Sequence, residues 1–185
     1  MTETGVNYAN ALADAQKQGF AEADPTNDVC GFDAARKLAI LSSIGFRANV
    51  TFDDVLVEGI EKIDKSDIQY AKDMGYTIKL LTVALRQENG IALNVYPAFL
   101  PDNHPLSSVK GAYNAIYVTG NIVDDVMFYG RGAGALPTAS AVMGDVISTA
   151  QHILNGSTGT GMIMTDTKRI PFYSSLKLQN SYYFR

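Results

Sequence analysis

The hydrophobic pattern of this chain changes at Gly75 from the spacing of helices to the spacing of strands. Before Gly75, apolar residues recur at helical spacing, which predicts helices over 7–18 and over Phe32–Phe46. After Gly75, residues 77–87 and 91–100 are rich in β-branched and aliphatic side chains and follow the two-residue period of strands. A helical part followed by a strand-rich part predicts an α+β fold.

Two turn signals made of asparagine and glycine divide the strand-rich part into hairpins. Asn89-Gly90 predicts the first hairpin, and Gly120-Asn121 predicts a second one between strands over 114–120 and 122–129. The four strands together suggest a largely antiparallel or mixed β-sheet that is covered by helices on one face. The other face of such a sheet stays available for dimerisation.

Three further helices are expected. Thr51 is a candidate N-cap for a short helix that reaches about Ile60, because Asp residues follow it in the first turn. Ser66 is expected to cap a helix over 67–74, and a longer helix is expected over 138–154.

Composition excludes several classes of protein. The 185 residues are 46% hydrophobic and 18% charged, which is enough for a buried core. A net charge of −4 without a basic run argues against nucleic-acid binding, and the apolar runs are shorter than the roughly 20 residues of a membrane helix. The single cysteine, Cys30, excludes an internal disulfide, and His104 reads as a turn or capping residue. No signal peptide is visible, so a cytoplasmic protein is expected.

An acidic stretch opens the second helix. Residues 19–37 carry Glu22, Asp24, Asp28 and Asp33, and Lys37 follows Asp33 by four residues, on the same helix face. One interpretation is helix punctuation, with a turn over 24–28 and Asp33 at the positive end of the helix. The other is a site at the lip of the core, where carboxylates bind a cationic substrate and Lys37 transfers a proton.

Two long motifs stand in this chain, and together they are more specific than a lone glycine pattern. The first is Ala15-x-x-x-Gly19-Phe20-Ala21-x-x-Asp24-Pro25-x-x-Asp28-Val29-x-Gly31-x-Asp33-x-x-x-Lys37. The second follows about a hundred residues later and runs from Phe128-Tyr129-Gly130-Arg131-Gly132-Ala133-Gly134 to Pro137-Thr138-Ala139-Ser140-Ala141-Val142. Both motifs resemble those of homoserine dehydrogenases, and the resemblance covers nearly the whole chain, from about Asn7 to Arg185.

The resemblance implies NAD(P)-dependent interconversion of L-homoserine and L-aspartate 4-semialdehyde, in threonine, methionine and isoleucine biosynthesis. It implies substrate binding by Glu22, Asp28 and Asp33, and proton transfer by Lys37, with Asp33 beside it as the second catalytic residue. Partial burial of Lys37 would favour its neutral amine, whereas Asp33 would favour the charged form. The nicotinamide end of the cofactor would meet Gly132, Ala133 and Gly134. No metal site is expected in this chain.

The same resemblance implies a division of the chain. Residues 1–135 would form a catalytic and dimerisation domain. Residues 136–155 would form a helix that packs on a nucleotide-binding domain, and residues 156–185 a linker and the start of an ACT-type regulatory domain. No nucleotide-binding unit precedes the acidic stretch.

We therefore expect the isolated chain to bind no cofactor tightly and to be inactive, with a homodimer formed through the sheet. The alternative is a dimerisation or scaffold module without enzymatic activity. A small-molecule sensor that uses the acidic loop would give no reason for Lys37 or for the glycine-rich segment 130–134.

Overall fold

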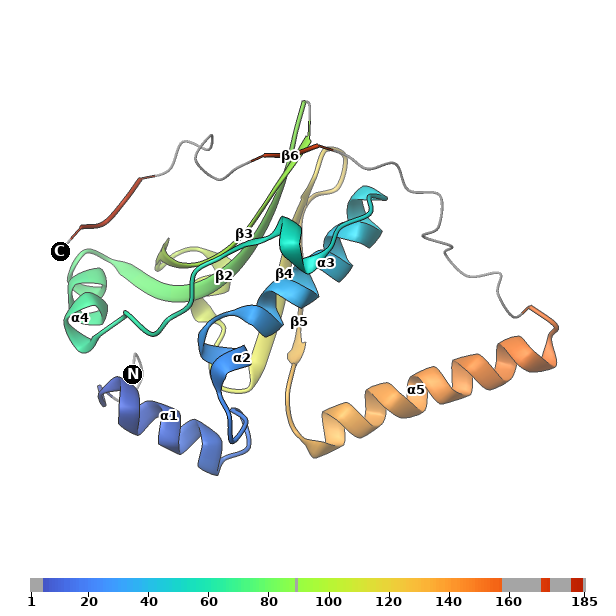
Figure 1. Cartoon of the computed structure of the whole chain (residues 1–185), viewed down its shortest axis with the longest axis horizontal. Helices are drawn as coiled ribbons and strands as arrows, with labels where there is room; N and C mark the ends of the chain where they lie inside the picture. The colour runs from blue at the N-terminus through green and yellow to red at the C-terminus, as the bar shows by residue number, and fades with distance from the viewer. Residues whose placement is uncertain (1–4, 89, 158–170, 174–180, 185) are drawn as a thin grey trace. The chain divides into compact units, whose positions relative to one another are not determined.

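The computed structural model describes residues 5–88, 90–157, 171–173 and 181–184. The helices are α1 (Tyr8–Lys17), α2 (Thr26–Val29), α3 (Phe32–Phe46), α4 (Lys65–Asp73) and α5 (Ala135–Leu154), with short 3-10 turns η1 (Phe52–Asp54) and η2 (Pro105–Ser108). The strands are β1 (Leu56–Val57), β2 (Tyr76–Gln87), β3 (Gly90–Pro101), β4 (Tyr113–Gly120), β5 (Asp124–Arg131) and β6 (Phe172–Tyr173) (Figure 1). The predicted α+β class is confirmed.

The chain divides into two compact units. The described residues of 24–63, 79–98 and 164–185 form one, which we call the sheet unit. Those of 1–23, 64–78 and 99–163 form the other, the hairpin unit. None of the helices within the described ranges combines the length and the apolarity that a membrane span needs.

In the sheet unit, β3 is the central strand of a mixed sheet. β2 lies on one side of it, and β1 and β6 pair with it in parallel, at Asn94–Val95 and Ile91–Ala92 respectively. β2 and β3 are neighbours separated by two residues in the sequence, a connection that only an antiparallel pair allows, so the first predicted hairpin is confirmed. Residues 171–173 fall inside the segment predicted as a linker, and Phe172 packs against the core of this unit.

Helix α3 covers this sheet. Every second residue of β3 points to the same face, and so Ile91, Leu93 and Val95 are all buried in one cluster. Helix α3 contributes its own stripe to that cluster, at helical spacing, through Ala35, Leu38 and Ala39. The predicted bounds of this helix, Phe32–Phe46, are confirmed.

Gly31 sets the start of α3. Its φ of 80° is in the left-handed region, which favours glycine. A Cβ at this position would lie 3.1 Å from the Val95 side chain and 3.3 Å from that of Val57. The first turn of α3 therefore lies close to β1 and β3, and Asp33 in that turn is placed by the same contact.

The hairpin unit contains an antiparallel β-ribbon. β4 and β5 pair from Tyr113 opposite Arg131 to Gly120 opposite Asp124, and Thr119 donates a hydrogen bond to Asp125 across the register at 2.7 Å. This confirms the second predicted hairpin with a slightly longer turn. The four predicted strands do not share one sheet, however, because β4 and β5 pair only with each other among the described strands.

Two local predictions were wrong in detail. The helix expected from Thr51 to about Ile60 ends after η1, because Leu56 and Val57 pair with β3 instead; the Thr51 cap is present, with Asp54 as its partner. Helix α4 is capped by Asp64 rather than by Ser66, whose N–H bonds to the Asp64 carboxylate at 2.7 Å.

The cap at His104 and the start of α5 were also predicted from the sequence. His104 caps η2, as predicted, by accepting a hydrogen bond from the Leu106 N–H at 3.1 Å. Helix α5 begins at Ala135, three residues before the predicted start at Thr138.

We predict that Gly31→Ala lowers the free energy of unfolding by roughly 1–3 kcal/mol, because a left-handed backbone and two close contacts oppose the new methyl group. Urea unfolding of the purified chain measures this. Gly45→Ala is the matched control, since Gly45 lies inside α3 with open space around it and the change should stabilise the helix by about 0.5–1 kcal/mol. Equal effects at the two positions would contradict the proposed constraint at Gly31.

Candidate active site

The acidic stretch begins where α1 ends. Gly19 has a φ of 73° and turns the chain out of the helix, as predicted. The Gln16 side-chain amide then donates hydrogen bonds to the carbonyls of Glu22, at 2.9 Å, and Ala23, at 3.2 Å. These bonds hold the backbone at Glu22 and Ala23, within the hairpin unit, while Glu22 itself is exposed.

In the sheet unit, Asp24 starts α2. Its carboxylate accepts hydrogen bonds from the Thr26 hydroxyl at 2.6 Å and from the Thr26 N–H at 3.1 Å. The Thr26 hydroxyl, and secondarily the Thr26 N–H, lower the pKa of Asp24 below its usual range. Asp24 is thereby committed to the turn, whereas Asp28 lies on the short helix α2 and is half-buried.

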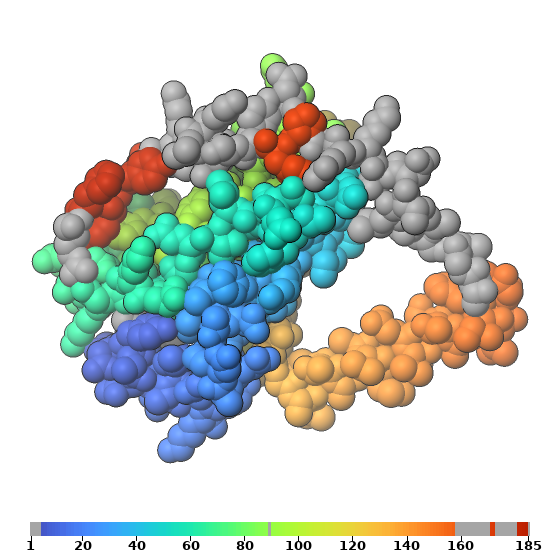
Figure 2. Space-filling model, in the orientation of Figure 1, coloured from blue at the N-terminus to red at the C-terminus, as the bar shows by residue number. Residues whose placement is uncertain are grey.

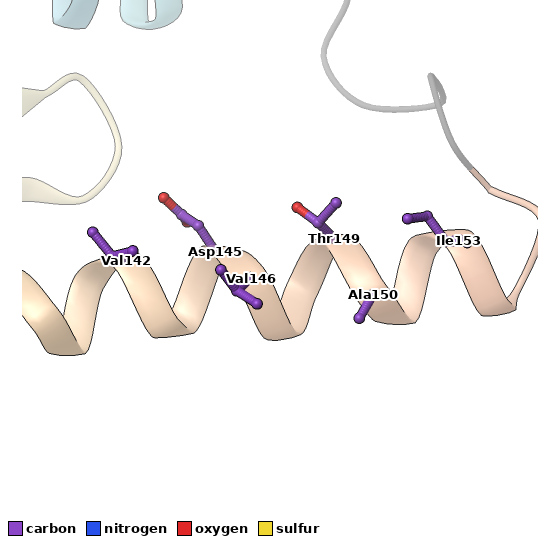
Figure 3. Close-up of a pocket in the computed structure, with 6 residues that line it drawn as sticks. All are labelled: Val142, Asp145, Val146, Thr149, Ala150 and Ile153. Carbon is purple, nitrogen blue, oxygen red and sulfur yellow. The ribbon is translucent and has the colours of Figure 1, made fainter.

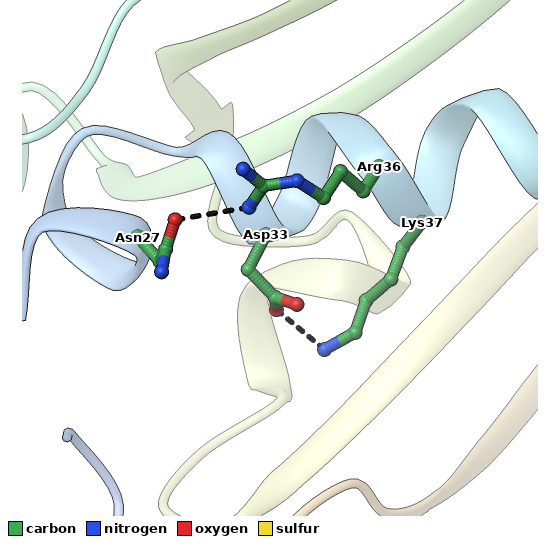
Figure 4. A network of polar contacts seen from close by, with 4 residues as sticks. All are labelled: Asn27, Asp33, Arg36 and Lys37. Atoms are coloured by element: carbon green, nitrogen blue, oxygen red, sulfur yellow. Dashed lines mark hydrogen bonds and ion pairs between the residues drawn. The ribbon is translucent and has the colours of Figure 1, made fainter. Parts of the chain in front are cut away.

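Asp33 and Lys37 form the ion pair that their spacing predicts. The Lys37 Nζ lies 2.6 Å from the Asp33 Oδ2, one turn of α3 apart (Figure 4). The exposed fractions of the two side chains are 65% for Lys37 and 47% for Asp33, so the expected position at the lip of the core is wrong for this chain. The reason is the direction of the buried stripe of α3, which runs through Ala35, Leu38 and Ala39.

The exposed side of α3 remains apolar beyond the ion pair. Ile40, Leu41 and Ile44 are exposed, although the helix was expected to be largely buried.

The ion pair of Asp33 and Lys37 is in contact with solvent. A solvated ion pair contributes about 0–1 kcal/mol to stability, so the fold gives little reason for its presence. Its chemistry is more informative: an amine and a carboxylate in direct contact can exchange a proton with a bound oxygen.

The glycine-rich segment joins β5 to α5. Gly130 and Arg131 belong to β5 rather than to a loop, and the connector is Gly132–Gly134. The Gly132 N–H donates to the Ala112 carbonyl at 3.1 Å, and the Asn114 side chain fills the place of a Cβ on Gly132. Gly134 has a φ of 118° and precedes α5, whose first turn has no side-chain cap. Such an entrance fits close backbone approach to a phosphate-bearing ligand.

Helix α5 presents an apolar face that no other described element of the hairpin unit covers. Apart from the half-buried Pro137, its side chains are exposed, and Figure 2 shows them open along the visible side of the orange helix. A shallow groove runs along the helix, lined by Val142, Asp145, Val146, Thr149, Ala150 and Ile153 (Figure 3). The predicted role of residues 136–155, packing on another domain, stays a prediction.

Cys30 has a partner that the sequence did not indicate. Its Sγ donates to the Glu61 carboxylate at 3.0 Å. This hydrogen bond, followed by burial and by the charges of Glu61 and Asp24, raises the pKa of the Cys30 thiol. The thiol is therefore kept protonated at neutral pH and is a poor nucleophile.

The structure brings together part of the predicted site. Asp33 and Lys37 are in contact, and α2, which carries Asp28, packs against α3. Glu22 and Gly132–Gly134 belong to the hairpin unit, and the other three residues belong to the sheet unit. Within the described ranges, no three His, Cys, Asp or Glu side chains gather where they could hold a metal ion.

Comparisons with known proteins all match this chain to homoserine dehydrogenases. A sequence profile of homoserine dehydrogenase matches residues 1–147. The homoserine dehydrogenase of Bacillus subtilis is 48% identical over 156 residues, which are 84% of this chain and 36% of that protein. The homoserine dehydrogenase of Mycobacterium tuberculosis H37Rv is 50% identical over 164 residues, 86% of this chain and 37% of that protein. The chain thus spans a little over a third of the length of these relatives.

Solved structures give the same result. A homoserine dehydrogenase from Thiobacillus denitrificans superposes with a TM-score of 0.86 at 38% identity, covering 94% of this chain and 41% of that one. The enzyme from S. aureus gives a TM-score of 0.76 at 42% identity, covering 83% and 39% of the two chains. A hyperthermophilic archaeal homoserine dehydrogenase mutant in complex with NADPH gives 0.59 at 27% identity, covering 77% and 40%.

The Cys30 contact gives a testable prediction. The substitution Glu61→Gln removes the carboxylate that raises the pKa of Cys30, so the thiolate fraction at about pH 8 should increase and alkylation by iodoacetamide should become faster. The rates should converge at high pH, where both thiols are ionised. Glu58→Gln, a second exposed carboxamide substitution in the same segment, is the control and should react like wild type. Identical pH–rate profiles for the Glu61→Gln variant and the wild-type protein would contradict the assignment.

Proposed function

Because the chain belongs to the homoserine dehydrogenase family, we propose that it supplies the substrate-binding and catalytic portion of an NAD(P)-dependent oxidoreductase. The reaction is the interconversion of L-homoserine and L-aspartate 4-semialdehyde. The observation that carries the proposal is the contact between Asp33 and Lys37 on α3, inside the part of the chain that the family profile matches.

Lys37 is the proton donor and acceptor in this proposal. In the reducing direction, its ammonium group donates a proton to the aldehyde oxygen of the semialdehyde as a hydride reaches the carbonyl carbon. In the oxidising direction, the neutral amine accepts the proton of the homoserine hydroxyl. The hydrogen bond from Lys37 to Asp33 restricts the orientation of the Lys37 side chain. Asp33 also contacts the substrate oxygen or a water molecule beside that oxygen.

Two further carboxylates are proposed to bind the amino-acid end of the substrate. The substrate ammonium group needs an anionic partner, which we assign to Glu22. Asp28 acts as a second anchor, and its place on α2 beside α3 supports this role. The pair of Asp33 and Lys37 is exposed in this chain, so exclusion of water from it has to come from bound substrate and from protein beyond these residues.

NAD(P), when bound, accepts or supplies the hydride. The connector Gly132–Gly134 fits such a ligand at its α5 end, because Gly134 has no Cβ and the first turn of α5 is not capped by a side chain. We propose that this connector meets the nicotinamide end of the cofactor. We also propose that the 185 residues alone bind NAD(P) weakly and do not turn over substrate, because they span only a little over a third of the length of the relatives.

A dimerisation role is the second candidate, and an exposed apolar face supports it. On one face of the β4–β5 ribbon, alternate residues are apolar and exposed: Ile116, Val118, Val126 and Phe128. We propose a homodimer in which this face meets the same face of a second copy. The role is compatible with catalysis, and by itself it would make the chain a scaffold module.

The proton-transfer role predicts the effect of Lys37→Ala in the full-length enzyme. Its kcat for L-homoserine oxidation, followed by absorbance of the reduced nicotinamide, should fall by about 10²–10⁴-fold. The free energy of unfolding should change by no more than about 0.5 kcal/mol, because the side chain is exposed. Lys72→Ala, on the exposed side of α4, is the control. A Lys37→Ala enzyme that keeps more than about a tenth of the wild-type kcat would refute the role.

The same assay on the 185-residue chain tests whether that chain is active by itself. Turnover would identify an autonomous enzyme, and absence of turnover is expected for a scaffold module.

The dimer proposal predicts that Phe128→Glu shifts the full-length protein toward monomer in sedimentation velocity, because a charge would enter an apolar interface. Met127→Glu places the same charge on the opposite face of β5 and should leave the dimer intact. A wild-type protein that sediments as a monomer, or equal dissociation by both variants, would rule out this face as the interface.

A further inference from the structure

Arg36 makes two contacts with residues outside the Asp33–Lys37 ion pair. It lies on α3 between Asp33 and Lys37 in sequence, and its side chain reaches toward α2, where its Nη1 donates a hydrogen bond to the Asn27 Oδ1 at 2.9 Å (Figure 4). Its guanidinium carbon also lies 5.3 Å from the centre of the Phe52 ring, a cation–π distance. Neither contact was indicated by the sequence.

Phe52 is itself held in place. Its ring meets that of Phe32, in the first turn of α3, edge to face with centroids 5.9 Å apart. The turn η1 that carries Phe52 is closed by Thr51, whose N–H and hydroxyl both bond to the Asp54 carboxylate at 2.8 Å. The guanidinium of Arg36 therefore rests on a surface that belongs to both η1 and α3.

The combined effect is a link between three segments. Arg36 joins α2, through Asn27, to α3 and η1, and the residue after Asn27 is Asp28, the proposed substrate anchor. The N-cap residue of the short helix α2, Pro25, makes no side-chain capping bond, and the Thr26 N–H is bonded by the Asp24 carboxylate within the same segment. The position of α2 relative to α3 depends on contacts such as that of Arg36 with Asn27.

We propose that Arg36 is a positioning residue, which holds α2 and hence Asp28 at the distance from Asp33 and Lys37 that the substrate requires. This inference rests on the proposed function. Arginine suits the task because its planar guanidinium can stack on a ring while its edge donates a directed hydrogen bond, whereas the ammonium group of lysine does only one of these well. Arg36 acts through Asn27 and Phe52 and takes no part in proton transfer.

The test is steady-state kinetics of the full-length enzyme. In Arg36→Met, the KM for L-homoserine should rise about tenfold, the loss expected for one charged hydrogen bond, with kcat reduced by no more than about threefold. The KM for NAD(P) should not change. Arg36→Lys should lie between wild type and Arg36→Met. Arg86→Met removes an exposed arginine near the end of β2 and is the matched control, with wild-type kinetics expected.

A double-mutant cycle identifies the route of the effect. Asn27→Ala should reproduce the rise in KM, and the double variant Arg36→Met/Asn27→Ala should be no worse than the poorer single variant. Three results would overturn the proposal: Arg36→Met kinetics equal to those of Arg86→Met, a loss confined to kcat as from a smaller folded fraction, or fully additive effects of the two substitutions. Failure of the proposed function is seen separately, as a wild-type enzyme whose homoserine oxidation is absent or does not depend on Lys37.

Discussion

The packing of α3 on β3 is the contact on which the candidate site depends. Small side chains on the helix, Ala35 and Ala39, allow its backbone to lie close to the sheet, and Gly31 removes the Cβ that would separate its first turn from Val57 and Val95. Asp33 and Lys37 follow within six residues of that glycine. Their place is therefore decided by a buried apolar interface, although they themselves are in water.

That arrangement separates the stability of the site from its chemistry. The surface ion pair adds little to folding, so substitutions of Lys37 can be read as chemical changes. The Arg36 link has a different character, because it joins α2 to α3 and to η1 by directed contacts. Rigid support behind a reactive pair is what a site needs when small displacements change the reacting geometry.

Large apolar side chains are exposed on three surfaces of the described chain. One face of the β4–β5 ribbon, the long helix α5, and the outer side of α3 at Ile40 and Ile44 all expose large apolar side chains. A monomeric soluble protein rarely leaves so many such surfaces in contact with water. The chain spans a little over a third of the length of its homoserine dehydrogenase relatives, and the exposed surfaces are consistent with the dimerisation role proposed above.

The sequence by itself determined the local features. The periodicity predicted α3 to the residue, Asn89-Gly90 and Gly120-Asn121 located the two hairpins, and the spacing of Asp33 and Lys37 predicted their ion pair. Only the tertiary structure decided that Leu56–Val57 becomes a parallel strand on β3 instead of helix, that the strands divide between two sheets, and that Lys37 is exposed. The contacts of Arg36 with Asn27 and Phe52 belong to the same class. The physical reason is the separation in sequence of the residues that interact. Capping, turns and helical spacing act within a few residues, whereas strand pairing and burial depend on segments far apart in the chain, whose contacts no local pattern encodes.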